Sequence, residues 1–148
     1  MAYEVIEDNY DEEEIIVVGI QPNGYKVAEK LISAIQKISD IHVTLHALLL
    51  DKSEPVHHKI EYDFASEDLN NKVCLLVDDV ANTGRTVFYA CQPFMDSSPR
   101  KLRIAVLVER SHKRFPISSD YIGLPLSTTM KEHVVVRMDD EEAVCLEE

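Results

Sequence analysis

The chain has 148 residues, of which 45 % are hydrophobic, so it is long enough for one domain with its own core. Its longest apolar runs fall far short of the ~20 residues that a membrane span needs, and its net charge of −12 argues against non-specific binding to nucleic acid. Three scattered cysteines without a CxxC spacing predict free thiols in a reducing compartment, by default the cytoplasm.

The negative charge is concentrated at the two ends of the chain. Residues 7–14 and 139–148 contain six acidic residues each and no Lys or Arg, whereas residues 15–138 contain 15 basic and 14 acidic residues. We expect both end segments to be solvated faces or frayed tails. A basic group at Arg100, Lys101 and Arg103 suits a dimer contact or solvated charge as well as RNA, and the acidic ends disfavour RNA.

Hydrophobic periodicity predicts that strands alternate with helices. Ile15 to Ile20 is a continuous apolar run typical of a strand buried on both faces, and apolar residues from Val27 to Ile38 recur with the 3.6-residue period of an amphipathic helix. The further predicted elements, in chain order, are a strand at 42–50, a strand or mobile loop at 58–64, a strand at 73–77, a helix at about 86–95 that Pro93 should end or kink, a strand at 103–109, a short segment at 120–122 and a last strand near 133–138.

This alternation indicates an α/β fold with a central, mainly parallel sheet flanked by helices. We expect residues 1–148 to form a single domain, with an acidic N-terminal segment at 1–14. In such sheets the ligand binds beyond the carboxyl ends of the strands. Asp78 and Asp79 directly follow the 73–77 strand, so both are expected at the ligand site.

The stretch VDDVANTGRT, residues 77–86, carries the strongest functional signal. A strand-to-helix turn that contains glycine directs several backbone N–H groups into one concavity, where the helix dipole adds positive potential. Residues 81–86 therefore predict a phosphate-binding turn, to which Thr83 and Thr86 add hydroxyl donors. The aspartates just upstream suit the paired hydroxyls of a ribose or a nearby bound cation. Ribose 5-phosphate satisfies both halves of this site.

Two alternatives exist for the acidic pair. Asp79 can be a solvated helix N-cap, although the spacing DDxxxTGxT and the two threonines favour a site. A phospho-acceptor signalling domain also has paired aspartates at strand ends, but early in the chain and with a separate acceptor Asp later. Elsewhere, His57-His58 has no partners at metal-ligand spacing and is expected to be exposed, and Cys74 and Cys91 are expected in the core.

VCLLVDDVANTGRTV, residues 73–87, closely resembles the phosphoribosyl-pyrophosphate motif of the type I phosphoribosyltransferases. The stretch IAVLVERSHKRFPISSDYIGLPLSTT, residues 104–129, is similar to the segment after this motif in the bifunctional pyrimidine-operon attenuators with uracil phosphoribosyltransferase activity. GIQPNGYKVAEKL lies where that family has its first substrate loop and helix. The resemblance covers about Ile15 to Asp139.

The resemblance implies a type I phosphoribosyltransferase fold and transfer of a phosphoribosyl group from phosphoribosyl pyrophosphate to a nucleobase, a pyrimidine such as uracil. It implies that Asp78 and Asp79 bind the ribose hydroxyls and that Asp79 stabilises positive charge on the sugar. The implied 5′-phosphate site comprises Ala81, Asn82, Thr83, Gly84, Arg85 and Thr86, and the implied pyrophosphate loop comprises Gln21, Pro22, Asn23 and Gly24. Mg²⁺ would arrive on the pyrophosphate, held mainly by its oxygens and by no protein ligand directly.

The resemblance also implies a lid and a hood. Residues 51–64 match a flexible lid that excludes water from the reactive sugar. Residues 110–129 match a hood over the base, with candidate contacts at Arg110, His112, Tyr121 and Ile122. The implied partners are phosphoribosyl pyrophosphate, the nucleobase and a second copy in a homodimer; RNA is disfavoured, and neither DNA nor a membrane is expected.

The chain departs from the related regulators at several positions. Its pyrophosphate loop has Gln21-Pro22-Asn23 where they carry a basic residue, and its lid begins Leu49-Leu50-Asp51 where they have Tyr-Arg-Asp. Ser111 replaces a glycine of the hood, and the helix before the first strand is missing or replaced by the acidic 7–14 segment. We expect weaker expulsion of pyrophosphate, compensated in part by Lys52 or Arg85. The alternative function is therefore a non-catalytic, nucleotide-binding regulator of pyrimidine metabolism.

Overall fold

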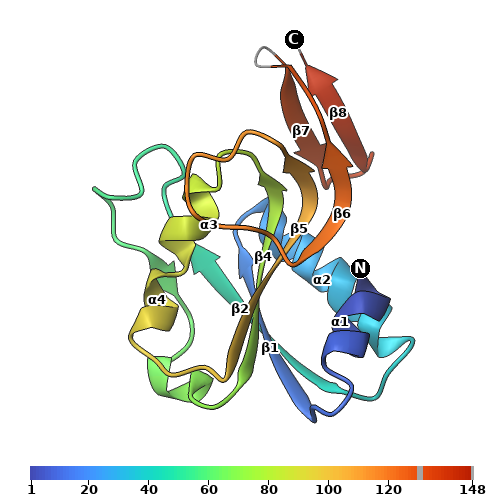
Figure 1. The fold of residues 1–148 in the computed structure, drawn as a ribbon, viewed down its shortest axis with the longest axis vertical. Helices are drawn as coiled ribbons and strands as arrows, with labels where there is room; N and C mark the ends of the chain where they lie inside the picture. The colour runs from blue at the N-terminus through green and yellow to red at the C-terminus, as the bar shows by residue number, and fades with distance from the viewer. Residues whose placement is uncertain (130–131, 148) are drawn as a thin grey trace.

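The computed structural model describes residues 1–129 and 132–147 and has a six-stranded sheet at its centre (Figure 1). The strand order is β3-β2-β1-β4-β5-β6, and neighbouring strands are parallel except for β3, which pairs antiparallel with β2. These strands are β1 (Glu14–Ile20), β2 (His42–Leu49), β3 (Glu61–Tyr62), β4 (Val73–Ala81), β5 (Lys101–Arg110) and β6 (Tyr121–Leu126). The predicted α/β fold with a mainly parallel sheet is confirmed.

Helices α1 (Ala2–Asp8) and α2 (Asn23–Gln36) cover one face of the sheet. The buried side chains of α2 recur three or four residues apart and pack against β1 and β4, which is the pattern of an amphipathic helix. In β1, Val17 belongs to the core on this face and Val18 to the core on the other face. The strand is thus buried on both faces, as its unbroken apolar run predicts.

Two short helices, α3 (Arg85–Ala90) and α4 (Gln92–Met95), cover the other face in place of the single helix expected at 86–95. Pro93 lies in the first turn of α4, where a residue without an N–H is tolerated because that group has no acceptor within the helix. The break agrees with the prediction that Pro93 ends or kinks the helix. Phe94 packs in the core, with its ring centroid 6.0 Å from that of Phe64, near the 3₁₀ helix η1 (Ser66–Leu69).

Three strands differ in extent from the prediction because pairing with a neighbour overrides local polarity. Strand β4 continues past Val77 to Ala81 and includes both aspartates, since its register with β5 extends to the pair Ala81 and Glu109. Strand β6 continues to Leu126, which pairs with Arg110. In the 58–64 segment, only β3 pairs with β2.

The acidic side chains of the two ends are mostly exposed, as predicted for solvated faces, but both ends contain regular secondary structure and are not frayed tails. A helix, α1, does precede β1, and it buries Val5 completely, so the expectation of a missing helix is wrong. At the other end, β7 (His133–Arg137) and β8 (Ala143–Glu147) form a separate antiparallel hairpin above the carboxyl ends of the central strands (Figure 1).

Acidic side chains of both end segments pair with basic side chains of the rest of the chain. Asp8 contacts Lys101 and Arg103, and Glu12 contacts Arg100, so the N-terminal segment matches the basic group at 100–103. The further pairs are Glu14–Lys72, Asp139–Lys26 and Glu142–Lys30. Composition reveals the charges but not their partners, which lie far away in the sequence. Within residues 1–129 and 132–147, the helices are too short and too polar to span a membrane.

Candidate active site

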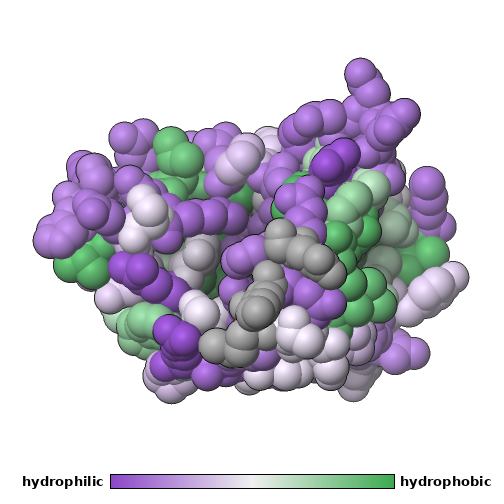
Figure 2. All heavy atoms as spheres, turned by 90° about the horizontal axis from the view of Figure 1, so that it is seen from above, coloured by the Kyte–Doolittle hydropathy of each residue, from purple (hydrophilic) through white to green (hydrophobic). Residues whose placement is uncertain are grey.

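The carboxyl end of β4 places Asp78 and Asp79 at the edge of the sheet that Figure 2 shows from above, where hydrophilic side chains predominate. Successive strand residues point to opposite sides, so Asp78 is 1 % exposed while the Asp79 side chain is 13 % exposed. Gly24, in the first turn of α2, packs against this strand: a Cβ there would lie 2.7 Å from the Val77 carbonyl oxygen and 3.0 Å from Asp78 Oδ1. Glycine at this position therefore lets α2 approach the aspartates.

Lys52, from the loop after β2, forms ion pairs with both aspartates. Its Nζ lies 3.1 Å from Asp78 Oδ1 and 3.4 Å from Asp79 Oδ1. Asp51 shapes this loop, because its Oδ1 accepts hydrogen bonds from the N–H groups of Ser53 and Glu54 at 2.9 and 3.1 Å. The sequence predicts that Lys52 or Arg85 compensates in part for the missing basic residues of the two loops. In the structure, Lys52 contacts both aspartates directly.

Burial and charge separate the pKa values of the two aspartates. Burial raises the pKa of Asp78 to about 7, against the opposing effect of the Lys52 ammonium. Among the described residues, Asp78 Oδ2 has no hydrogen-bond partner. Burial also acts to raise the pKa of Asp79, but Lys52, Asp78 and the Asn23 amide outweigh it and hold that pKa below its ordinary value. Near neutral pH, Asp79 is therefore ionised while Asp78 can take up or release a proton.

The turn between β4 and α3 has the shape expected of an anion-binding site. Gly84 has a φ of +82°, which glycine adopts without strain, and a Cβ there would lie 2.4 Å from Ile117 Cγ2. Thr83 Oγ1 accepts a hydrogen bond from the Arg85 N–H at 3.3 Å. Helix α3 has only six residues, so its dipole is weaker than that of a long helix. The prediction that this turn binds a phosphate therefore depends mainly on its N–H groups.

A cavity of about 460 Å³ lies beside this turn. It is lined by Asn82, Thr83, residues 110–114 and His133. The Thr83 carbonyl oxygen accepts hydrogen bonds from the N–H groups of Arg114 and Phe115, at 2.9 and 3.1 Å, which join the turn to the predicted hood. The structure thus brings two predicted hood residues, Arg110 and His112, next to the predicted phosphate turn.

Arg110 and His112 are themselves bound to the segment after β6. The buried Arg110 guanidinium donates to Thr128 Oγ1 at 2.7 Å and to the carbonyl oxygens of Thr129 and Glu132 at 3.1 and 2.7 Å. His112 Nε2 lies 3.0 Å from the Thr128 carbonyl oxygen. Both side chains therefore hold the wall of the cavity in place, and their direct contact with a base stays a prediction.

The structure does not bring the Tyr121 side chain to this cavity. It is buried in the core beneath α1, on the opposite face of the sheet, and its hydroxyl donates to Asp8 Oδ2 at 2.5 Å. The prediction that this side chain contacts the base is wrong, because α1, which was not expected, covers it. Ile122 points to the other face and packs against the core under α3 and α4, outside the lining of the cavity.

The predicted pyrophosphate loop, Gln21–Gly24, connects β1 to α2 and contains a cis bond before Pro22. Within it, Asn23 Nδ2 donates to Asp79 Oδ2 at 3.1 Å and to the Val136 carbonyl oxygen at 2.9 Å. These partners lie 56 and 113 residues away, so no local pattern in the sequence could reveal the contacts. Asn23 was predicted as part of the pyrophosphate loop, but its contacts with Asp79 and Val136 were not predicted.

The other candidate residues have structural environments. His57 and His58 are exposed in the irregular loop after β2, as predicted. No cluster of three or more His, Cys, Asp or Glu side chains within the described ranges is placed to hold a metal ion. Cys74 is buried in the core and Cys91 packs against it half-buried.

Comparison with known proteins gives consistent findings. The family model described as phosphoribosyl transferase domain matches residues 1–141. The chain is 34 % identical over 151 residues to the bifunctional protein pyrR of Enterococcus faecalis (96 % of this chain, 83 % of that protein) and 37 % identical over 153 residues to the bifunctional protein PyrR of Listeria welshimeri (95 % and 82 %). Its structure resembles hypoxanthine phosphoribosyltransferase from Trypanosoma cruzi in complex with the product IMP, with a TM-score of 0.75, 15 % identity and coverage of 95 % of this chain and 77 % of that one; this likeness concerns the fold alone.

Proposed function

Because the chain belongs to the phosphoribosyl transferase family and is a phosphoribosyltransferase, we propose that it transfers the phosphoribosyl group of phosphoribosyl pyrophosphate to a pyrimidine, uracil, and releases pyrophosphate. The fold is that of the type I enzymes. The proposal rests on one observation: two adjacent carboxyl groups lie near the carboxyl end of β4, and a left-handed glycine follows five positions after Asp79. A ribose 5-phosphate has a diol that suits the carboxyl pair and a phosphate that suits the glycine turn. The choice of uracil rests on the similarity to PyrR proteins over most of the chain.

In the proposed complex, the turn of residues 81–86 binds the 5′-phosphate through backbone N–H groups and threonine hydroxyls. Asp78 and Asp79 accept hydrogen bonds from the ribose hydroxyls. As the bond to pyrophosphate breaks, positive charge develops on the sugar in an oxocarbenium-like transition state. The ionised Asp79 carboxylate stabilises this charge, and no covalent nucleophile is needed. The lowered pKa of Asp79 supports this role.

The base and the pyrophosphate lie on different sides of the ribose in this proposal. The cavity beside Thr83 receives the base, with its wall held by Arg110 and His112. The pyrophosphate lies towards Lys52 and the Gln21–Gly24 loop. Because that loop contains no basic residue, Lys52 supplies the nearby positive charge.

Mg²⁺ is the cofactor of the proposed reaction. Mg²⁺ commonly keeps several waters and takes substrate phosphate oxygens as ligands, which suits a site whose described residues offer no cluster of three protein ligands. When it is bound to pyrophosphate, it neutralises charge on the leaving group. The chain's own contribution is the Lys52 ammonium, which adds a second positive charge next to the carboxyl pair.

A steady-state assay with phosphoribosyl pyrophosphate, Mg²⁺ and a panel of uracil, orotate, hypoxanthine and guanine tests the proposal. We expect the highest kcat/KM with uracil, and a loss of about 100-fold or more in kcat for Asp79→Asn, since a neutral amide cannot stabilise the developing charge. A preference for a purine would contradict the choice of uracil.

A second candidate function is a non-catalytic regulator that binds a nucleotide. It is favoured by the absence of a basic residue in the Gln21–Gly24 loop and by the use of the Asn23 amide for internal contacts. No turnover with any base of the panel, together with micromolar binding of UMP, would establish this function instead.

We also propose that the protein forms a homodimer in the cytoplasm and does not bind RNA. Three unpaired cysteines suit a reducing compartment. The ion pairs of Arg100, Lys101 and Arg103 with Asp8 and Glu12 reduce the positive charge available to a phosphate backbone. Light scattering after size exclusion tests the dimer, and a binding assay with RNA at physiological salt tests the last point.

A further inference from the structure

The side chain of Asn23 joins two parts of the molecule, the acidic pair and the C-terminal hairpin of β7 and β8. Its Nδ2 donates to Asp79 Oδ2 at 3.1 Å and to the Val136 carbonyl oxygen in β7 at 2.9 Å. An amide nitrogen has two N–H groups, and both are used here. Both partners are acceptors, so only this orientation of the amide fits. The side chain of Asn23 therefore has no N–H left to donate to a pyrophosphate.

Asn23 controls the orientation of the Asp79 carboxylate. Asp79 Oδ1 is contacted by the Lys52 ammonium and by the N–H of Val80, and its neighbour Asp78 lies on the same strand. Its Oδ2 is contacted by Asn23 alone among the described residues. Without the amide, the carboxylate would lose its contact at Oδ2 and be held at Oδ1 alone, so its orientation would be less tightly fixed.

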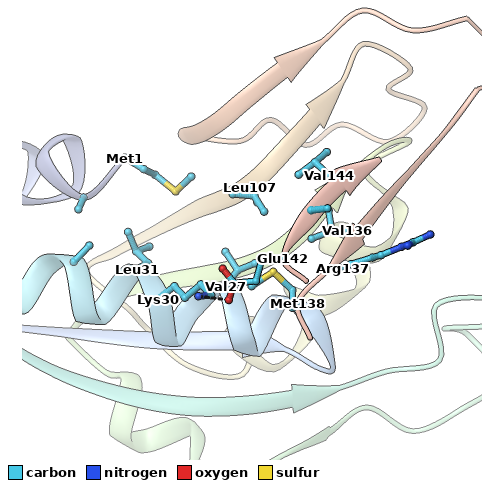
Figure 3. A pocket seen from close by; sticks show the side chains of 13 residues that line it. Met1, Val27, Lys30, Leu31, Leu107, Val136, Arg137, Met138, Glu142 and Val144 are labelled. Carbon is cyan, nitrogen blue, oxygen red and sulfur yellow. Dashed lines mark ion pairs between the residues drawn. The ribbon is translucent and has the colours of Figure 1, made fainter. Parts of the chain in front are cut away.

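The hairpin whose Val136 carbonyl oxygen accepts from Asn23 faces α2 across a cavity (Figure 3). Two ion pairs, Lys26–Asp139 at 2.8 Å and Lys30–Glu142 at 2.5 Å, connect the two elements. Between them lies an apolar cavity of about 410 Å³. Its lining includes Val27 and Leu31 of α2, Leu107 of β5, and Val136, Met138 and Val144 from the hairpin region. The ion pairs and the Asn23 hydrogen bond therefore contribute to the position of β7, together with the Arg110 hydrogen bond to the Glu132 carbonyl oxygen just before it.

We propose that Asn23 is a positioning residue through which the C-terminal hairpin fixes the Asp79 carboxylate for the reaction. The hairpin holds the amide at the Val136 carbonyl oxygen, and the amide holds the carboxylate. A movement of the hairpin on α2 is thereby transmitted to the group that stabilises the charged sugar. This inference rests on the proposed function and assigns a catalytic purpose to the hairpin.

The first test compares Asn23→Ala with Gln36→Ala, an exposed position at the other end of α2. Asn23→Ala should lower kcat by about 10- to 100-fold and change the KM for phosphoribosyl pyrophosphate less than about threefold, because Asp78 and the phosphate turn still bind the substrate. The control should match the original chain in both constants. An Asn23→Ala enzyme that loses melting temperature but keeps its kcat would reduce Asn23 to a structural role and overturn the inference.

The second test is a double-mutant cycle with Lys26→Met/Lys30→Met, which removes both ion pairs between α2 and the hairpin. We expect this change to lower kcat several-fold when Asn23 is present and to have no further effect in the Asn23→Ala background, because the hairpin acts through Asn23. The same loss in both backgrounds would mean that the hairpin does not act through Asn23.

The same variants separate this inference from the proposed function. If the original chain turns over no base of the panel, the proposed function fails, and calorimetric titration with UMP then decides the inference. Asn23→Ala and the lysine pair should then each weaken UMP binding by about two- to threefold and in a non-additive way, since both act on the same carboxylate while Asp78 and the phosphate turn still bind. Additive effects on UMP affinity, or none, would overturn the inference.

Discussion

The two ends of the proposed active site, one for ribose phosphate and one for pyrophosphate, are built in different ways. The ribose-phosphate end comes from one continuous stretch, Asp78–Thr86, whose shape is set by β4 and by the left-handed Gly84. The pyrophosphate end is assembled from Lys52 and from Asn23 with its partner Val136, which lie on three separate segments. The conformation of a continuous motif is set mainly by its own residues. An assembled end changes its charge and its partners through single substitutions, and that is where this chain departs from the regulators it resembles.

Substitution of Gly84 by valine should give the largest effect, at the continuous end. Valine resists the left-handed φ of +82°, and its Cβ would lie 2.4 Å from Ile117 Cγ2, so the turn must move. We expect kcat/KM for phosphoribosyl pyrophosphate to fall by about 1,000-fold. In Gly84→Ala, both the clash of the new Cβ with Ile117 and the backbone strain lower activity. A second change, Ile117→Ala, removes the clash and should therefore recover part of the activity of Gly84→Ala. Normal activity of Gly84→Val would show that this end does not depend on its turn.

Replacement of Asp78 by asparagine should change stability in a pH-dependent way. The folded-state pKa of Asp78, about 7, lies above the ordinary value of 3.8. The stability gained from its proton is therefore fully present below pH 4 and lost as the pH rises through 7. In urea unfolding, the advantage of Asp78→Asn should grow by roughly 2–3 kcal/mol between pH 5 and pH 8, less the lost attraction to Lys52. An advantage that does not change with pH would contradict a protonated Asp78.

Removal of the Lys52 charge tests the assembled end. Lys52→Met should lower kcat by about 10- to 100-fold, because the carboxyl pair loses its cation and the leaving group loses a nearby positive charge. Lys59→Met, in the same loop, is the matched control, since Lys59 is exposed and forms no ion pair among the described residues. Equal losses for both variants would mean that only the overall charge of the loop matters.

The smallest effect is expected at Ser111, where the related regulators have glycine. Its side chain is exposed, and Ser111→Gly should change kcat and KM by no more than about twofold. A larger change in the KM for uracil would show that the backbone conformation of the hood depends on residue 111. The differences from the related regulators would then affect the base site as well as the pyrophosphate end.

The contrast between a continuous and an assembled end also explains which parts of the site could be predicted from the sequence. The acidic pair and its turn follow from an apolar strand and a glycine only five positions after Asp79, so their arrangement is local. The contacts of Asn23 and Lys52 depend on chain folding over long distances. Tyr121 was misplaced because its burial depends on α1, a helix of only seven residues, too short for its 3.6-residue period to be recognised. Strand β8 was not predicted because its apolar residues form only a short run between acidic residues.

The order of the segments also has a consequence for synthesis on the ribosome. Val136 and Asp139 each follow their partners, Asn23 and Lys26, by 113 residues. At about 5–20 residues per second the whole chain is made within seconds, and the hairpin is made last. The contact that we propose to orient Asp79 can therefore form only after nearly the entire chain has been synthesised. A chain that ends before Val136 would keep the acidic pair and the glycine turn but lose the carbonyl oxygen that holds the Asn23 amide.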